Sequence, residues 1–178
     1  MNLTKLFDAQ RVLANRIVEE HPELKGQDNL PWKILAFQVE VGELANEWRG
    51  FKMWSHDRKP RTKNGCFVVV DGKVKEQNPL LEEYVDCLHF LLDIGLEMKY
   101  EKLVKTINPI KNDNIINQFI FINTKAGTLL TYRALSNYIH ILQNLIGLGE
   151  MLGFTWEEIE AAYFEKNKIN HERQQNKY

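Results

Sequence analysis

Two short pairs of acidic residues have the types and the spacing that suit chemistry at a metal ion. Glu40 and Glu43 form one pair, Glu83 and Asp86 form the other, and no basic residue stands between the members of either pair. In a helix, two like charges three residues apart share one face and repel each other by about 0.2–0.5 kcal/mol. Mg²⁺ relieves such repulsion, since it prefers carboxylate, water and phosphate oxygens. The pairs therefore predict a site for one or more Mg²⁺ ions, although acid pairs at this spacing are also common on solvated helix faces.

Near the end of the chain, two basic residues and an amide share one face of an expected helix. Lys166, Asn170 and Arg173 are spaced i, i+4 and i+7, and two cations that flank an amide suit phosphate oxygens and a sugar hydroxyl. Taken alone, a basic last turn is better explained by the helix dipole, which such a turn complements. Together with the acid pairs, it predicts an anionic substrate that a metal ion bridges to the carboxylates.

The elements that must position these residues are mostly helices, because apolar residues recur at helical spacing along most of the chain. The expected helices cover residues 2–20, 28–50, 78–98, 114–122, 128–149 and 155–174. Asp71-Gly72 stands between two β-branched runs and predicts a tight turn. The sequence thus predicts an all-α bundle of about five to seven helices in one domain, residues 1–178, with a small β-hairpin insertion near residues 66–75.

Composition narrows the class of protein. The chain has 178 residues with 24 acids and 23 bases, so its formal charge of −1 argues against binding to a nucleic-acid polymer. Cys66 and Cys87 are too few for a disulfide framework and predict reduced thiols in the cytoplasm. No apolar run approaches the roughly 18 residues of a membrane span, so we expect no membrane partner.

These motifs resemble those of a known family. The chain resembles the dimeric, all-α dUTP diphosphatases, within the wider group of all-α nucleoside-triphosphate pyrophosphatases, over nearly its whole length. The matching segments are Glu40-x-x-Glu43, Phe51-Lys52-x-Trp54, Glu82-Glu83-x-x-Asp86-x-Leu88-His89-Phe90 and Lys166-x-x-x-Asn170-x-x-Arg173-Gln174. The acid pairs mark only the wider group, whereas the residues that follow Asp86 and the C-terminal set narrow the resemblance to the dUTPase branch.

The resemblance implies hydrolysis of dUTP, and also of dUDP, to dUMP in a homodimer. It implies that Glu40, Glu43, Glu83 and Asp86 bind Mg²⁺, which Mn²⁺ can replace. A water on the metal would then lose its proton to a general base, Glu40 or Glu43. The remaining site residues implied are contacts to uracil from Phe90, Gln10 and Asn15, a pocket wall from Trp54, and contacts to phosphate and sugar from Lys166, Asn170 and Arg173.

Two alternatives stay open at the level of the sequence. The same metal site could serve a pyrophosphohydrolase that acts on another nucleotide, such as dCTP. A helical interaction module without activity could also carry such a fold, although it would have little reason to retain four mutually repelling acids. Apart from Phe51-Lys52-x-Trp54, the basic loop at residues 49–63 matches no motif of the family, and the hairpin region matches none.

Overall fold

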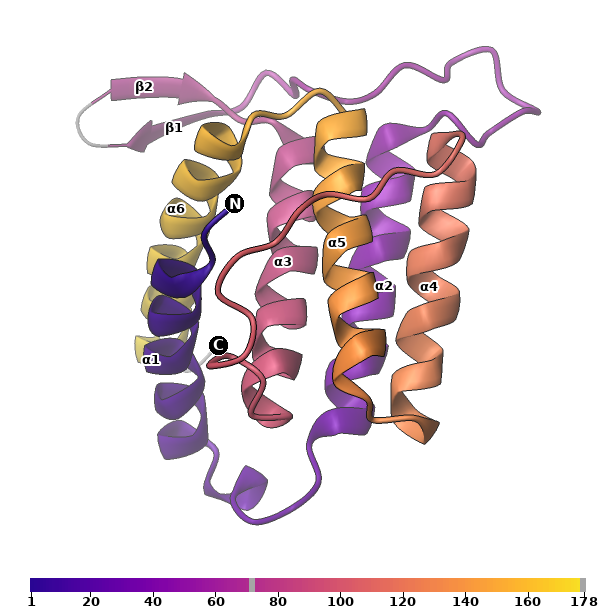
Figure 1. Ribbon diagram of the computed structural model, residues 1–178. Helices are drawn as coiled ribbons and strands as arrows, with labels where there is room; N and C mark the ends of the chain where they lie inside the picture. Colours follow the sequence, from indigo (N-terminus) through magenta and orange to yellow (C-terminus); the bar gives the residue numbers. More distant parts are fainter. Residues whose placement is uncertain (71–72, 177–178) are drawn as a thin grey trace.

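The computed structural model describes residues 1–70 and 73–176, and within them it shows a bundle of six α-helices (Figure 1). The helices are α1 (Thr4–Glu20), α2 (Leu30–Trp48), α3 (Pro79–Glu97), α4 (Ile115–Thr131), α5 (Leu135–Met151) and α6 (Trp156–Gln175). One 3₁₀ turn, η1 (Pro22–Leu24), follows α1. The all-α class is therefore confirmed. Every helix in the described part of the chain is too short or too polar to cross a membrane.

Polar side chains fix where several helices begin. Thr155 and Glu158 form the predicted capping box at the start of α6, because each side chain accepts a hydrogen bond from the backbone of the other. Asn78 caps α3 by accepting from the Leu81 amide, and Asn114 caps α4 in the same way. These caps satisfy amides that have no partner within the helix.

The helix α2 ends two residues before the predicted end at residue 50. The helix stops at Trp48, and Arg49 takes the left-handed conformation at φ 62°. The Arg49 guanidinium donates to the carbonyl of Asp57 at 2.8 Å, which compensates for this unfavourable backbone. Gly50 is required because a Cβ there would lie 2.3 Å from the Trp48 ring. Trp48 therefore folds back over its own helix end.

The two helices expected at 114–122 and 128–149 have different bounds in the structure. α4 continues to Thr131, since Leu129 is fully buried and belongs to the apolar stripe of α4. α5 begins only at Leu135, after Ala134 takes an extended conformation. Apolar residues keep their helical spacing across the break. The sequence analysis therefore assigned the last residues of α4 to the same helix as α5.

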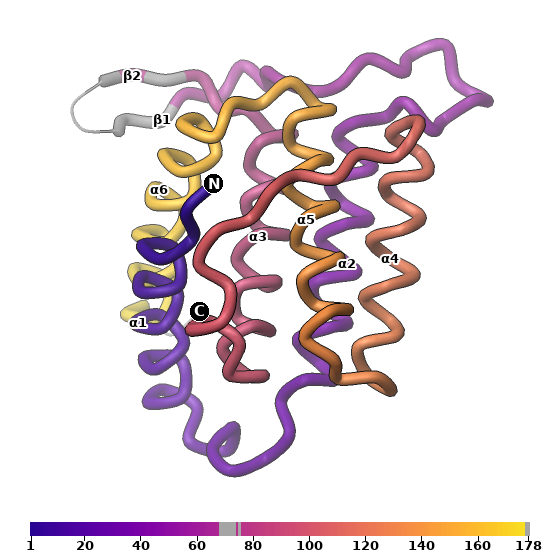
Figure 2. Tube along the Cα trace, in the orientation of Figure 1, coloured from indigo at the N-terminus to yellow at the C-terminus, as the bar shows by residue number. Residues whose placement is uncertain are grey.

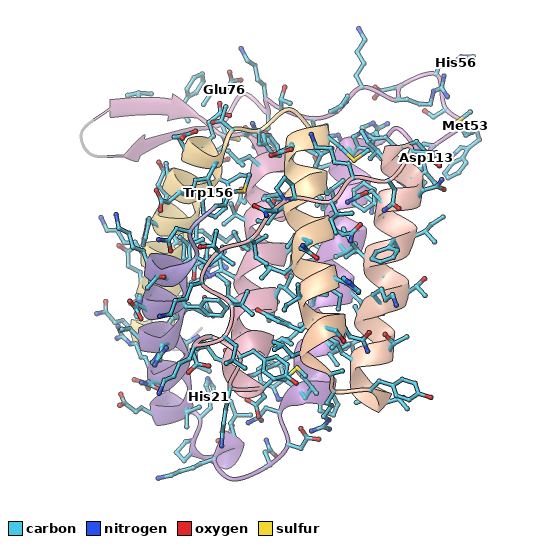
Figure 3. All side chains as sticks on the ribbon, in the orientation of Figure 1. His21, Met53, His56, Glu76, Asp113 and Trp156 are labelled. Carbon is cyan, nitrogen blue, oxygen red and sulfur yellow. The ribbon has the colours of Figure 1, made fainter. Side chains whose placement is uncertain are left out.

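The insertion between α2 and α3 contains a long loop and two short strands. The strands, β1 (Phe67–Val70) and β2 (Lys73–Glu76), pair antiparallel with Phe67 opposite Glu76 and Val70 opposite Lys73. The expected turn at Asp71-Gly72 lies outside the described residues. Met53 and His56 lie on the part of the loop that projects from the bundle (Figure 3). Arg61 ties the loop down, because its amide donates to Glu47 and its carbonyl accepts from Leu80.

A chain segment between α3 and α4 passes across the face of α5 (Figure 2). It makes its closest approach at Gly147, where a Cβ would lie 1.9 Å from the Ile110 carbonyl oxygen. Gln118 donates to that same oxygen at 2.8 Å. Beneath it, the core is continuous across all six helices, and α2 and α3 pack along one another. This helix pair carries both predicted acid pairs.

Candidate active site

Carboxylates from α2 and α3 meet between the two helices. Oxygen atoms of Glu40, Glu43 and Glu83 all lie within 4.8 Å of one another. Glu40 and Glu83 are partly buried and Glu43 is exposed, so the cluster is open to solvent on one side. The spacing of three residues on each helix aims both members of a pair toward the facing helix. Three of the four predicted metal ligands therefore converge.

The electrostatics of this cluster fit a site for a cation. Burial raises the pKa of Glu40 to about 7, with further contributions from the charges of Asp86 and Glu43. Burial likewise raises the pKa of Glu83 to about 7, again with help from Asp86 and Glu43. Carboxyl groups that resist ionisation in this way are stabilised by an added positive charge. Hard oxygen donors at this density suit Mg²⁺ or Mn²⁺.

Asp86, the fourth predicted ligand, is held by a lysine from α6. Lys166 Nζ lies 2.6 Å from Asp86 Oδ2 and 2.8 Å from Glu82 Oε1. Burial lowers the pKa of Lys166, but Asp86 and Glu82 outweigh that effect and the pKa stays above its usual value. Burial raises the pKa of Asp86, and Lys166 opposes the rise. The predicted phosphate-binding lysine thus lies beside the predicted metal ligands.

The rest of the predicted C-terminal set continues along α6 from Lys166. Asn170 is partly buried and Arg173 is exposed. The charge of Arg173 lowers the pKa of Asp86, which places its guanidinium within electrostatic reach of the cluster. All three side chains therefore lie on the helix that borders the acids, as the spacing predicts.

Gln10 lies in the core and is already hydrogen-bonded there. Its Oε1 accepts from the Tyr163 hydroxyl at 2.8 Å and lies 2.9 Å from His89 Nδ1. The His89 ring stacks on Tyr163 with centroids 4.1 Å apart. Burial lowers the pKa of His89 to about 3, so the imidazole is neutral. These contacts join α1, α3 and α6, and the uracil contact predicted for Gln10 would need its remaining amide atom.

The two predicted aromatic contacts are placed differently. Phe90 is partly buried and packs on the core one turn beyond Asp86. Trp54 is 77% exposed on the loop after α2, where its ring contacts Phe51 edge to face at 5.7 Å. Phe90 thus lies on the acid-bearing face of α3, whereas Trp54 stands on the projecting loop.

A second group of charges lies between the start of α2 and the end of α3. The sequence analysis missed this group. Lys33 Nζ is 3.1 Å from Asp93 Oδ2 and 2.8 Å from Glu97 Oε2. Burial raises the pKa of Asp93, and Lys33 opposes that rise. Lys33 precedes Glu40 by seven residues and Asp93 follows Asp86 by seven residues, so each shares a helix face with a predicted ligand. This spacing does not show that the two helices are neighbours. Asn15, predicted to bind substrate, lines the cavity next to this group.

Comparison with known proteins identifies the family. The chain matches no curated protein and no solved structure significantly. The model of the dUTPase family, however, matches residues 2–178. The match spans both acid pairs, the loop with its strands, and the whole of α6. The chain accordingly belongs to the dUTPase family, and it is an all-α enzyme of dUTP hydrolysis.

Proposed function

We propose that the chain hydrolyses dUTP, and also dUDP, to dUMP in a reaction that depends on Mg²⁺, with Mn²⁺ as a substitute. The observation that carries this proposal is the convergence of Glu40, Glu43 and Glu83 beside the Lys166–Asp86 pair. From dUTP the second product is pyrophosphate, and water supplies the incoming oxygen. We assign the reaction to a single domain, residues 1–178.

The carboxylates would hold the metal, and the metal would supply a water of lowered pKa and charge stabilisation on the phosphates. Glu40 or Glu43 accepts the proton of the attacking water. Without a metal, burial raises the pKa of Glu40 to about 7, and a bound cation would lower that pKa again, so that the carboxylate is ionised and able to accept a proton. Glu43 is the exposed member of the pair, so it is accessible to water.

The basic residues of α6 neutralise the phosphates. Lys166 and Arg173 lie beside the acids rather than among them, so a triphosphate bound to the carboxylates through metal would meet both cations. Such groups stabilise the charge that develops on the departing oxygens. Asn170, between them on the same face, offers an amide to the sugar or to a phosphate oxygen.

Release of pyrophosphate from dUTP, dCTP, dTTP and UTP, with Mg²⁺ and with a chelator, tests the proposal. We expect turnover of dUTP that the chelator abolishes and that Glu40→Gln reduces at least 100-fold, in line with the usual contribution of a general base. Glu19→Gln, at an exposed position of α1, serves as the control and should behave as the unmodified protein. Turnover of dCTP instead would retain the metal chemistry and reject uracil as the base, and no turnover by a folded protein would favour an interaction module.

An exposed apolar surface supports a homodimer. Leu35 and Val39 on α2 are 63% and 49% exposed, and Ile116 and Ile120 on α4 are 38% and 58% exposed. Each pair is spaced i, i+4 and therefore forms a stripe, and the two helices pack side by side. Light scattering should give twice the chain mass, and Leu35→Glu with Ile120→Glu should give the monomer.

The unpaired Cys66 and Cys87 support a cytoplasmic location.

A further inference from the structure

The basic loop that follows α2 returns across the ends of α2 and α3 before it enters β1 (Figure 1). Arg61 contacts both helices there. Its amide donates to the Glu47 carbonyl at 2.9 Å, and its carbonyl accepts from the Leu80 amide at 3.1 Å. The backbone of this one residue therefore joins the last turn of α2 to the first turn of α3, and these are the two helices that carry the carboxylate cluster.

The side chain of Arg61 lies on the face of α2 that carries the cluster. Its Nη1 is 3.0 Å from Glu47 Oε1, and Glu47 follows Glu43 by four residues and Glu40 by seven. At about 100° per residue these three acids share one face of the helix, and Glu47 lies about 6 Å beyond Glu43 along the axis. The guanidinium is thus held about one turn beyond the cluster, at the end of the helix pair.

The ion pair with Glu47 leaves the guanidinium able to bind a further anion. The Arg61 side chain is 53% exposed, whereas that of Glu47 is 18% exposed. Because the backbone of Arg61 already fastens the loop, and an exposed ion pair contributes little to stability, the side chain is not needed for that purpose. A guanidinium offers a planar fork of N–H donors that matches a phosphate group.

The other two arginines of the loop are bound within the loop itself. The Arg49 guanidinium donates to the Asp57 carbonyl at 2.8 Å, and Arg58 Nη1 donates to Met53 Sδ at 3.1 Å. Arg61 differs from both, because its partner is an acid on the cluster face of α2. Among the arginines of the loop, Arg61 is therefore the one placed to meet a ligand of the carboxylate cluster.

The order of residues along α3 indicates which part of the substrate Arg61 meets. From the end of the helix that Arg61 fastens, the chain passes Glu83 and Asp86 and then reaches Phe90, the residue expected to contact the base. With the base at Phe90 and the phosphates at the acids, the triphosphate extends toward the start of α3. Its terminal phosphate is then the group that lies farthest from the base and nearest to Arg61.

We infer that Arg61 binds the terminal phosphate of dUTP, the phosphate that dUDP lacks, and thereby gives the site a preference for the triphosphate. The guanidinium donates to the phosphate oxygens from the N–H groups that Glu47 does not take. The loop between α2 and α3 thus adds a cation to Lys166 and Arg173 of α6. The inference rests on the proposed function, because it assumes that the other two phosphates bind at the carboxylate cluster.

The first test measures kcat/KM for dUTP and for dUDP in Arg61→Met, which removes the charge but keeps a long side chain. We expect the ratio of dUTP to dUDP to fall about tenfold or more, as the loss of a hydrogen bond to a charged group predicts, while the value for dUDP changes less than about twofold. Lys63→Met is the matched control, since Lys63 belongs to the same loop and also pairs with an acid, Glu76. An unchanged ratio in a folded Arg61→Met protein would overturn the inference.

A second variant separates a phosphate contact from a structural ion pair. Glu47→Gln removes the partner of Arg61 but keeps the guanidinium, so the preference for dUTP should stay the same or increase. If Arg61 served only to hold Glu47, this variant would lose the preference as Arg61→Met does, and the inference would be wrong.

Binding of pyrophosphate gives a measurement that does not depend on turnover. The terminal phosphate of dUTP leaves as part of pyrophosphate, so isothermal titration of pyrophosphate in Mg²⁺ should show binding about tenfold weaker in Arg61→Met than in the unmodified protein. The other product, dUMP, carries only the phosphate next to the sugar and should bind both proteins equally. Equal affinity of the two proteins for pyrophosphate would contradict the assignment.

The outcomes separate the inference from the proposed function. If the unmodified protein hydrolyses neither dUTP nor dUDP, the proposed function fails, and the inference fails with it. If it hydrolyses both and Arg61→Met lowers both equally or neither, only the assignment of Arg61 is wrong. If it hydrolyses dUTP alone, the pyrophosphate titration decides: weaker binding in Arg61→Met supports the inference, and equal binding rejects it.

Discussion

The two ends of the α2–α3 pair both carry acidic residues, but at one end the acids face one another and at the other end they pair with a lysine. At one end, Glu40, Glu43 and Glu83 face one another, and burial raises the pKa of Glu40 and of Glu83 to about 7. At the other end, Asp93 and Glu97 both contact Lys33. One end is therefore built to receive a positive charge, whereas the other already contains its own. The same helix faces can thus serve a functional site at one end and an internal ion pair two turns away.

Removal of an acid from the carboxylate cluster should have the largest effect on activity and should not reduce stability. Glu83→Gln should lower dUTP turnover by about 10²–10⁴-fold, the range for groups that position or stabilise reacting charge. In a chelator, its thermal midpoint should equal or exceed that of the unmodified protein, because one repelling charge is lost. A lower midpoint without metal would show that the cluster stabilises the fold, contrary to this comparison.

Removal of Lys33, the basic residue at the other end of the α2–α3 pair, should chiefly lower the stability of the fold. Lys33→Met leaves the buried Asp93 and the partly buried Glu97 without their cation, and breaking a buried ion pair in this way costs about 3–5 kcal/mol of unfolding free energy. Urea unfolding measures the change. Lys63→Met, which removes a partner of Glu76 from an exposed ion pair, should alter the free energy by less than about 1 kcal/mol. Equal effects of the two variants would contradict the internal role of Lys33.

Lys166 is itself a cation that lies beside the carboxylate cluster. Its removal therefore tests whether this end of the α2–α3 pair has a greater need for positive charge than the Lys33 end. Lys166→Met frees Asp86 and removes a positive charge beside the cluster, and Mn²⁺ binding without substrate should tighten about tenfold, equal to 1.4 kcal/mol. The variant should also lose kcat/KM for dUTP, because a phosphate contact is gone. Isothermal titration with Mn²⁺ tests the first expectation, and weaker binding would show that Lys166 does not compete with the metal.

The smallest expected effect is a pH dependence of stability at the cluster. A carboxyl whose pKa is raised by folding binds more protons in the folded state, so its contribution to stability is present below about pH 4.5 and is lost as the pH rises through about 7. In a chelator, the unmodified protein should therefore lose stability relative to Glu83→Gln between pH 5 and pH 8, by about 1 kcal/mol after solvent screening. Comparison with the variant cancels the opposing effect of His89, and a constant difference would disprove the shifted pKa.

The sequence predicted what depends on local patterns. Residue spacing within one helix is fixed by the sequence and does not depend on which helices pack together. It was enough to predict the capping box at Thr155, the acid pairs, and the shared face of Lys166 and Arg173. The bounds of α4 and α5 were wrong because an apolar stripe does not show the three-residue break at 132–134. The Lys33–Asp93 pair and the burial of Gln10 depend on which helices become neighbours, and a single sequence does not contain that information.

The packing of α1 on α6 has a consequence for how the chain folds during synthesis. Tyr163 donates to the carbonyl of Leu6 across 157 residues, and α1 packs against both α3 and α6. Leu6 and Phe7 are fully or almost fully buried, and because α1 packs on α6 as well as on α3, the packing of α1 is complete only after α6 leaves the ribosome. Such distant contacts slow folding compared with helical proteins whose neighbours are local. The first helix thus has a packing partner that is synthesised last, and we expect a chaperone to bind the nascent chain at α1.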